Sequence, residues 1–297
     1  MIIDSNILTR KKFKVIICGS GPAGISLALD LEKKKIDCLI IESGDKFYTD
    51  EAQKRYEGKV VGNFPDNLSE LRLSQFGGSS GHWGGSCGVL DDYDFKKWPI
   101  NKMDLDPFLD DSCKILNIKN QFREKEITDN LKIIEFKKSD VMFFDKYFEH
   151  IKKSKYINLV LNSSIFDIKT ENGRIKQIII KSESINYIDT NILVLACGGI
   201  ENSRLLLWFR ENNNSISQKM PIGNFWMEHP FKVIGTGIGN FKKIKKFFYN
   251  DFDKFNNFRN WGNFTVSLSP TEKAIQGEKI LNSCAFLTIH DRDNQNI

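Results

Sequence analysis

The first forty residues of the chain alternate between short apolar runs and an amphipathic stretch. Lys14–Cys18 is a short apolar run, which fits a buried parallel strand. A glycine-rich turn follows, and Ile25–Lys35 then carries apolar residues at helical spacing. Asp37–Ile41 is a second apolar run that ends at Glu42. The pattern predicts a β-α-β unit.

After residue 44 the pattern of apolar and polar residues predicts a long loop, a helix and then mainly strands. An irregular region from 44 to about 100 holds the densest glycine cluster, and so long a loop is usually functional. A helix is predicted at Asp104–Leu116, with Pro107 in its first turn. Three strands with a tight turn at Asn172-Gly173 predict a β-meander: Asn158–Ile168, Arg174–Ile180 and Ser184–Ile188. A strand and a helix follow, at Asn191–Ala196 and Ile200–Phe209. A second sheet is predicted from Phe231–Gly239, Asn263–Leu268 and Ile280–His290.

Composition narrows the class of protein. Of the 297 residues, 40% are hydrophobic and 27% charged, as in a soluble globular protein. The net charge of +5 is spread along the chain, so nucleic acid is not an expected partner. No uncharged apolar run reaches the ~18 residues of a membrane helix, and the N-terminus lacks a signal-peptide pattern. We therefore expect a cytoplasmic protein with no membrane span. The six cysteines form no CxxC pair, which predicts reduced thiols and no metal site.

The turn after the first strand carries a GxGxxG pattern, Gly19-Ser20-Gly21-Pro22-Ala23-Gly24. The first glycine allows a tight turn, the second lets the backbone approach a pyrophosphate, and the third lets the helix pack on the strand. The helix N-terminus would face the anion. Glu42 stands where an acid accepts ribose hydroxyls, which favours FAD or NAD over NADP. The alternative is a glycine turn that only packs a helix.

Two features favour FAD over NAD. The predicted meander leads into a second strand–Gly–Gly–helix segment at Ala196-Cys197-Gly198-Gly199, which can close around the same cofactor. The other feature is the glycine-rich loop Phe76–Gly85, whose backbone can approach a ligand closely. Within it, His82 would lie near a flavin edge or would simply be exposed. We predict an α/β fold: a Rossmann-like FAD-binding domain with a parallel sheet and a β-meander, plus part of an antiparallel-sheet domain.

In order and spacing, these motifs resemble the glucose–methanol–choline (GMC) family of FAD-dependent oxidoreductases. The resemblance rests on Gly19–Gly24 with Glu42, Gly77–Gly85, Trp98-Pro99-Ile100, Ala196–Leu206, and Gly223 with Met227–Pro230. It implies a FAD-binding domain at 1–225, with loop and helical insertions at 50–150, and an incomplete substrate-binding domain at 226–297. The implied reaction is oxidation of a CH–OH group of an alcohol, sugar or polyol by hydride transfer to flavin N5.

The resemblance also implies the residues that contact FAD. They are Gly19, Gly21, Pro22, Ala23, Gly24, Glu42, Gly77, Gly78, Ser79, His82, Trp83, Gly84, Ile165, Ala196, Gly198 and Asn202. In some members a histidine at the place of His82 is bonded covalently to the flavin, and that bond is a hypothesis for this chain. His229 matches a family position that is not the base, so a structural role is expected for it.

The family's catalytic histidine and its His or Asn partner have no match in this chain. His290 reads as the end of a strand rather than as a base. Three hypotheses follow. The chain is an N-terminal portion of a longer enzyme, or it is one half of a split enzyme with a C-terminal partner chain, or it is a non-catalytic flavin-binding or regulatory protein. Its motif variants look closer to sugar and polyol dehydrogenases than to oxidases, which predicts a quinone, cytochrome or dye as electron acceptor rather than oxygen.

Overall fold

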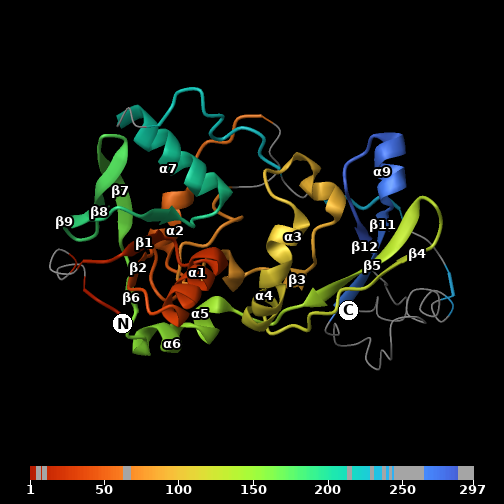
Figure 1. The fold of residues 1–297 in the computed structure, drawn as a ribbon, viewed down its shortest axis with the longest axis horizontal. Coiled ribbons are helices and arrows are strands. Elements are labelled where there is room, and N and C mark those ends of the chain that lie inside the picture. Colours follow the sequence, from red (N-terminus) through yellow and green to blue (C-terminus); the bar gives the residue numbers. More distant parts are fainter. Residues whose placement is uncertain are drawn as a thin grey trace. The chain divides into compact units, whose positions relative to one another are not determined.

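A computed structural model describes residues 1–4, 8, 12–62, 68–212, 216–227, 231–235, 239–240, 243 and 264–286 (Figure 1). Its contacts divide the chain into two units. Unit 1 consists of Met1–Trp83 and Val141–Pro230, and unit 2 of Gly84–Asp140 and Phe231–Ile297. Residues 84–140, which the sequence had placed among insertions of the first domain, therefore group with the second unit.

Unit 1 is built on a four-stranded parallel sheet in the order β10-β1-β2-β6. Its strands are β1 (Val15–Cys18), β2 (Cys38–Ile41), β6 (Ile157–Val160) and β10 (Leu193–Leu195). The helix α1 (Pro22–Lys33) connects β1 to β2, which confirms the predicted β-α-β unit. Every residue of β1, β2 and β6 is buried, as expected for strands covered on both faces.

A three-stranded antiparallel meander forms a second sheet in unit 1. It consists of β7 (Ser164–Glu171), β8 (Arg174–Lys181) and β9 (Ile185–Asp189) in sequential order. Asn172 and Gly173 have φ values of 51° and 72°, so both central residues of the β7–β8 turn adopt the left-handed conformation that the Asn-Gly pair predicted. The meander is thereby confirmed.

The first predicted strand of the meander, Asn158–Ile168, was wrong in its extent. It comprises β6, which belongs to the parallel sheet, and the start of β7. Asn162 lies between them with φ 50°, a conformation that asparagine tolerates better than most residues and that ends the first strand. The short polar segment Asn162-Ser163-Ser164 therefore marks a change of sheet that the prediction of a single strand missed.

The last helix of unit 1, α7 (Gly199–Asn212), packs onto the meander (Figure 1). Leu205 and Phe209 of this helix are buried in one apolar cluster with Ile168 and Ile178 of the meander. The same cluster includes Ile16 and Leu39 of the parallel sheet. Burial of these side chains stabilises the packing of α7 against the two sheets of unit 1.

The two edges of the parallel sheet differ. At β6, Ile2 forms a parallel bridge with Leu159, and the Ile3 N–H donates to the Leu159 carbonyl at 2.9 Å. At the other edge, within the part of the chain that the structure describes, β10 pairs with β1 alone. Its three residues are partly exposed. Short helices complete the unit: α2 (Asp50–Gln53), α5 (Phe143–Lys146) and α6 (Phe148–Lys153).

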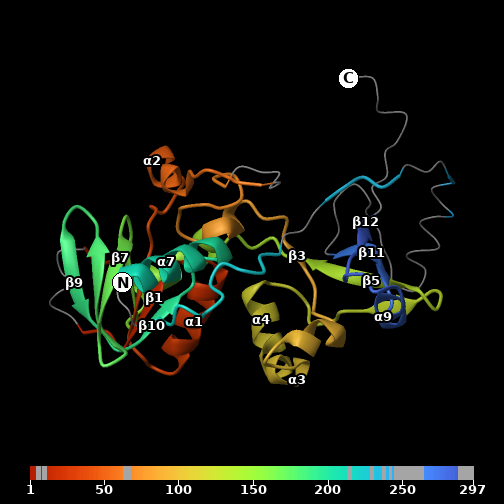
Figure 2. The same ribbon diagram turned by 90° about the horizontal axis from the view of Figure 1, so that it is seen from above.

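Unit 2 contains an antiparallel sheet centred on β5 (Leu131–Lys138) and β11 (Phe264–Pro270), which pair along the whole length of β11 (Figure 2). Three short strands join them: β3 (Ser86–Cys87), β4 (Glu124–Glu126) and β12 (Ala285–Phe286). The predicted strand Asn263–Leu268 is confirmed by β11. Of Ile280–His290, only Ala285–Phe286 is a described strand, and 287–290 lie outside the described residues. Residues 231–235 form no strand, and 236–238 are not described.

The helices of unit 2 are α3 (Lys102–Leu105), α4 (Leu109–Ile115) and α9 (Glu272–Glu278). The single helix predicted at Asp104–Leu116 is divided, because a 3-10 turn at Asp106–Phe108 separates α3 from α4. Pro107 lies in that turn and lacks the N–H that a continuous helix needs. No helix among the described residues is long and apolar enough to cross a membrane.

Candidate functional site

The GxGxxG turn joins the end of β1 to the start of α1. Gly19 has φ 100°, a left-handed conformation that favours glycine, and its N–H donates to the Ile41 carbonyl at 2.8 Å. A side-chain carbon at Gly24 would overlap the Gly19 carbonyl oxygen. The turn is therefore closed tightly against the end of the sheet, as the predicted roles of Gly19 and Gly24 require.

The N-terminus of α1 is open to a ligand. Gly21 is the N-cap residue, and no side chain caps the helix. A carbon added at Gly21 would meet no atom within 4 Å, so empty space lies in front of the first turn. Unpaired N–H groups at a helix N-terminus, together with the positive end of the helix dipole, form an anion-binding site.

Glu42 lies in the wall of the same space and is only 5% exposed. Its Oε2 accepts hydrogen bonds from the Ser20 N–H at 3.0 Å and the Ser20 hydroxyl at 2.6 Å. Its Oε1 accepts one from the Gly44 N–H at 2.9 Å. Burial raises the pKa of this carboxyl above its ordinary value, although these hydrogen bonds oppose the shift. Glu42 therefore anchors the glycine turn to the end of β2.

This raised pKa predicts a pH dependence of stability. A carboxyl with a higher pKa in the folded state contributes most below its unfolded value of 4.5, and that contribution is lost as pH rises through the folded pKa. We therefore compare the free energy of unfolding in urea for the wild type and the Glu42→Gln variant. The difference, wild type minus variant, should fall as pH rises from 4.5 through the pKa of Glu42 in the folded state, and should then level off. The exposed Glu51→Gln variant should follow the wild-type curve. A constant difference between wild type and Glu42→Gln across pH would contradict the shift.

The glycine-rich loop packs against the GxGxxG turn. The Gly77 N–H donates to the Ser20 carbonyl at 3.0 Å, and a side-chain carbon at Gly78 would lie 3.1 Å from the Gly21 Cα. Ser80 closes the loop by donating from its hydroxyl to the Gly77 carbonyl at 2.7 Å. The two segments, more than fifty residues apart in the chain, thus form one continuous surface.

A second glycine turn joins β10 to α7 and is held by Asn202. The Asn202 Oδ1 accepts from the Cys197 N–H at 2.9 Å, and its Nδ2 donates to the Leu195 carbonyl at 3.2 Å. Gly198 has φ 81°, and the Ala196 N–H donates to the Cys18 carbonyl at 2.7 Å. The turn therefore lies directly beside the first one.

Replacing Asn202 with alanine should destabilise the chain by about 2 kcal/mol, because the partly buried Cys197 N–H and Leu195 carbonyl both lose a partner. The free energy of unfolding, measured by urea titration, checks this. Asn212→Ala, at the exposed end of the same helix, removes a bond to the Trp208 carbonyl and should change stability by less than about 0.5 kcal/mol. Equal effects of the two substitutions would contradict the role of Asn202.

These segments enclose a cavity of about 1010 Å³, which lies wholly within unit 1. Ten of the predicted site residues line it: Gly19, Gly21, Pro22, Ala23, Glu42, Gly78, Ser79, Ile165, Ala196 and Gly198. Three others, Gly24, Gly77 and Asn202, lie behind the lining and hold its turns in place.

The other predicted residues do not line this cavity. His82 is exposed, and the indole N–H of Trp83 donates to the Val141 carbonyl at 3.1 Å. Gly84 is exposed and begins unit 2. His229 and His290 lie outside the described residues.

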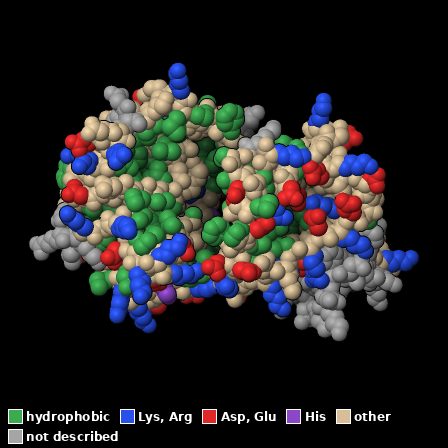
Figure 3. Space-filling model, viewed as in Figure 1, with side chains coloured by type: hydrophobic (Ala, Val, Ile, Leu, Met, Phe, Trp, Pro, Cys, Tyr) green, Lys and Arg blue, Asp and Glu red, His purple; other side chains and the backbone are tan. Residues whose placement is uncertain are grey.

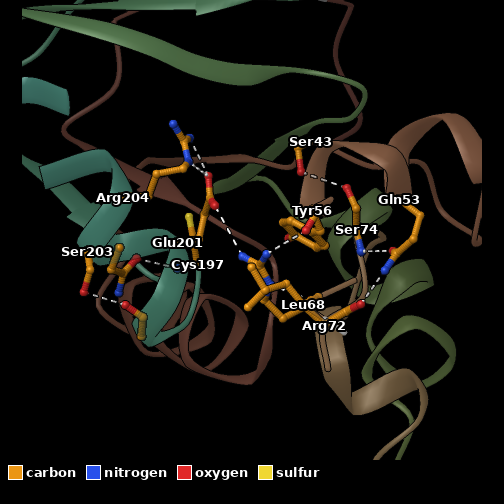
Figure 4. Close-up of polar contacts among 12 residues, drawn as sticks. Ser43, Gln53, Tyr56, Leu68, Arg72, Ser74, Cys197, Glu201, Ser203 and Arg204 are labelled. Atoms are coloured by element: carbon orange, nitrogen blue, oxygen red, sulfur yellow. Dashed lines mark hydrogen bonds and ion pairs between the residues drawn. The ribbon is translucent and has the colours of Figure 1, made fainter. Parts of the chain in front are cut away.

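Sequence reasoning missed a polar cluster in the cavity wall (Figure 4). Glu201, in the first turn of α7, accepts from the Arg204 Nε at 2.8 Å and pairs with the Arg72 Nη1 at 3.5 Å. The guanidinium of Arg72 lies 4.1 Å from the centroid of the Tyr56 ring and donates to the Tyr56 carbonyl at 3.2 Å. Hydrogen bonding to Glu201 raises the pKa of Arg204. This cluster connects the loop before the glycine-rich segment to the start of α7.

Aromatic side chains form another part of the wall. The rings of Phe166 and Trp208 have centroids 6.2 Å apart, and Trp226 also lines the cavity. All three are more than one-third exposed. Figure 3 shows hydrophobic side chains gathered on the face of unit 1 that carries α7. The cavity thus combines a helix N-terminus without a side-chain cap, paired charges and flat apolar surfaces.

No protein-family model and no curated protein matches the chain. Solved structures similar to it include a pyridoxine 4-oxidase from Mesorbium loti, with a TM-score of 0.49, 14% identity, and coverage of 67% of this chain and 52% of that one. A fungal aryl-alcohol oxidase has a TM-score of 0.46 and 12% identity, covering 65% and 47%. A FAD-dependent oxidoreductase from Chaetomium thermophilum has a TM-score of 0.48 and 13% identity, covering 67% and 47%. The chain spans about half the length of these structures.

Proposed function

We propose that the chain is a FAD-binding oxidoreductase of the GMC family that acts on the CH–OH group of an alcohol, sugar or polyol. The observation that carries the proposal is the convergence of two glycine turns at the ends of β1 and β10 on one cavity, with an open helix N-terminus facing it. Ligands of open parallel α/β sheets bind at the carboxyl ends of the strands. The order of the motifs in the sequence supports the GMC family in particular.

The residues present fit a dinucleotide. The first-turn N–H groups of α1, beside the bare Gly21, would bind the pyrophosphate. Glu42 is in the wall where a ribose would lie, and its bonds to Ser20 would rearrange to accept a hydroxyl. The backbone at Ile165, which also lines the cavity, would contact the adenine. FAD, when bound, supplies the hydride acceptor for oxidation of the alcohol carbon.

The proton acceptor for that oxidation is not assigned. Within the described residues, no histidine lines the cavity: His82 is exposed, and His150 pairs with Glu32 at 2.6 Å. Because the family's catalytic histidine has no match in the motifs of this sequence, we propose that the base is supplied either by a longer form of this chain or by a C-terminal partner chain. The electron acceptor we propose is a quinone, a cytochrome or a dye rather than oxygen.

A second candidate function is a non-catalytic flavin-binding or regulatory protein. The described lining of the cavity favours it, because it includes no histidine and its carboxylates, Glu42 and Glu201, are held in hydrogen bonds or ion pairs. Such a protein would bind FAD through the same two turns. It would differ from the oxidoreductase only in that it does not oxidise a CH–OH group.

Anaerobic titration of the flavin-loaded protein separates these functions. With about one FAD bound per chain, the oxidoreductase should lose the absorbance of oxidised flavin when primary alcohols, sugars or polyols are added. Bound FAD with no bleaching across that panel would support the non-catalytic protein. A chain that binds no FAD would contradict both. Flavin that leaves the denatured protein would rule out a covalent bond to His82.

A further inference from the structure

Two cysteines from different parts of the sequence meet at the cavity wall. Cys18 is the last residue of β1, and Cys197 lies in the turn after β10. Because β1 and β10 are parallel neighbours with Cys18 paired to Leu195, the chain beyond β10 continues past the end of β1. The two sulfur atoms are 3.2 Å apart, and both residues line the cavity. The six cysteines of the chain are all free thiols.

The two thiols differ in access. Cys18 is 7% exposed, whereas Cys197 is partly exposed. The Cys197 Sγ also donates to the Cys18 carbonyl at 3.1 Å, and Asn202 fixes its backbone N–H. The hydrogen bond to Cys197, together with burial, raises the pKa of the Cys18 thiol. Cys197 is therefore the sulfur that a reagent entering the cavity reaches first, and Cys18 is the sulfur behind it.

Cys197 lies beside an ion pair of α7. It stands in the turn just before α7, beside Glu201 and Arg204 of that helix (Figure 4). The guanidinium of Arg204 interacts electrostatically with both cysteines. The thiolate is the nucleophile in disulfide exchange, and Cys197 is the more accessible of the two cysteines.

We propose that Cys18 and Cys197 form a redox-sensitive pair that a small-molecule disulfide converts into an intramolecular disulfide in the cavity wall. The Cys197 thiolate attacks the reagent, forms a mixed disulfide and releases one thiolate. The Cys18 thiol, whose pKa is raised, then gives its proton to the released thiolate or to water, attacks the Cys197 sulfur, releases the second thiolate and closes the bond. One reagent disulfide is reduced to two thiols, and the two cysteines together lose two protons and two electrons.

The bond requires a small movement. A disulfide has an S–S length of about 2.05 Å, so the sulfurs must approach by about 1 Å. Gly198, with φ 81° and no atom within 4 Å of an added side-chain carbon, follows Cys197 directly and leaves room for the turn to shift. The bond would join the ends of β1 and β10, and with them the two glycine turns that line the cavity. It would therefore couple the thiol redox state to the shape of this site.

Mapping of the wild-type protein tests the pair without any substitution. The folded chain is treated with dithiobis(nitrobenzoate), an aromatic disulfide whose released thiolate is coloured, and is then digested without reduction. We expect a cross-linked peptide containing Cys18 and Cys197, lighter by two hydrogens and carrying no aryl group. The exposed Cys284 should instead keep one aryl group and serve as an internal control. Two separate aryl adducts at residues 18 and 197, or no reaction at either, would overturn the proposal.

Variants and ligand sharpen the result. Cys197→Ala should abolish the cross-link and leave Cys18 unmodified, whereas Cys284→Ala should retain the cross-link.

Adding FAD beforehand should slow formation of the Cys18–Cys197 disulfide at least several-fold, because Cys197 lines the cavity. This FAD experiment rests on the proposed function. If FAD does not bind, the proposed function fails while the mapping still decides the thiol pair. If FAD binds and the closure rate is unchanged, the pair does not face the ligand and its coupling to the site is wrong.

Discussion

Replacing Gly21 with alanine is expected to weaken FAD binding by at least ~100-fold, about 3 kcal/mol, while the chain stays folded. Gly21 is the N-cap of α1 and lines the cavity. An added methyl group would meet no protein atom within 4 Å, so the folded chain accommodates it at the cost of about 1 kcal/mol for a poorer cap. The same methyl group would fill the space that a pyrophosphate needs to reach the helix N-terminus. Fluorescence titration of FAD measures the loss, and thermal unfolding checks the fold.

Gly277→Ala supplies the matched control. Gly277 lies in α9 of unit 2, and an added carbon there also meets nothing within 4 Å. Alanine is a better helix former, so this variant should gain up to about 1 kcal/mol and bind FAD like the wild type. FAD binding by Gly21→Ala within a few-fold of the wild type would show that the ligand does not approach this helix.

Replacing Gly24 with alanine should instead damage the fold. The added carbon would overlap the carbonyl oxygen of Gly19 and lie 3.3 Å from a side-chain carbon of Ile17. Neither the backbone oxygen nor the fully buried Ile17 can move without separating α1 from β1. Overpacking of this kind costs about 3 kcal/mol. Urea unfolding monitored by circular dichroism should show the loss, and FAD binding should weaken with it.

The two substitutions in one turn therefore separate two roles of glycine. Gly21→Ala should keep the midpoint of urea unfolding close to that of the wild type, whereas Gly24→Ala should lower it strongly. A Gly24→Ala variant as stable as Gly21→Ala would mean that α1 does not pack against the turn as closely as the structure shows.

The sequence predicted the elements whose signals are local. The β-α-β unit at the N-terminus combines short apolar runs with a helical pattern and a glycine turn, and each signal lies within a few residues of the element it predicts. The turn at Asn172-Gly173 was predictable because few residues other than Asn and Gly accept two successive left-handed conformations. Ten of the predicted site residues line one cavity because most belong to glycine turns of this local kind.

What could not be predicted depends on contacts between distant segments. Only the short polar segment Asn162-Ser163-Ser164 marks the junction of β6 and β7, which belong to different sheets, and a local pattern does not show which sheet each strand joins. Half of the residues in the strand Leu131–Lys138 are charged, and its pairing with Phe264–Pro270 brings together residues more than a hundred positions apart. Likewise, Arg72 and Glu201 are ordinary surface residue types, and only the folded chain shows that they meet at the cavity. The same holds for the sulfurs of Cys18 and Cys197.

Equilibrium dialysis of the purified, flavin-free chain against FAD tests the central claim most directly, with NADP as the competing ligand. Glu42 is a buried acidic residue in the cavity wall, and it is the residue that we propose for the ribose; a second phosphate beside its carboxylate would be repelled. We predict saturation at about one FAD per chain and no displacement of FAD by NADP. Absence of FAD binding, or displacement of FAD by an equal concentration of NADP, would contradict the assignment of this cavity as a FAD site.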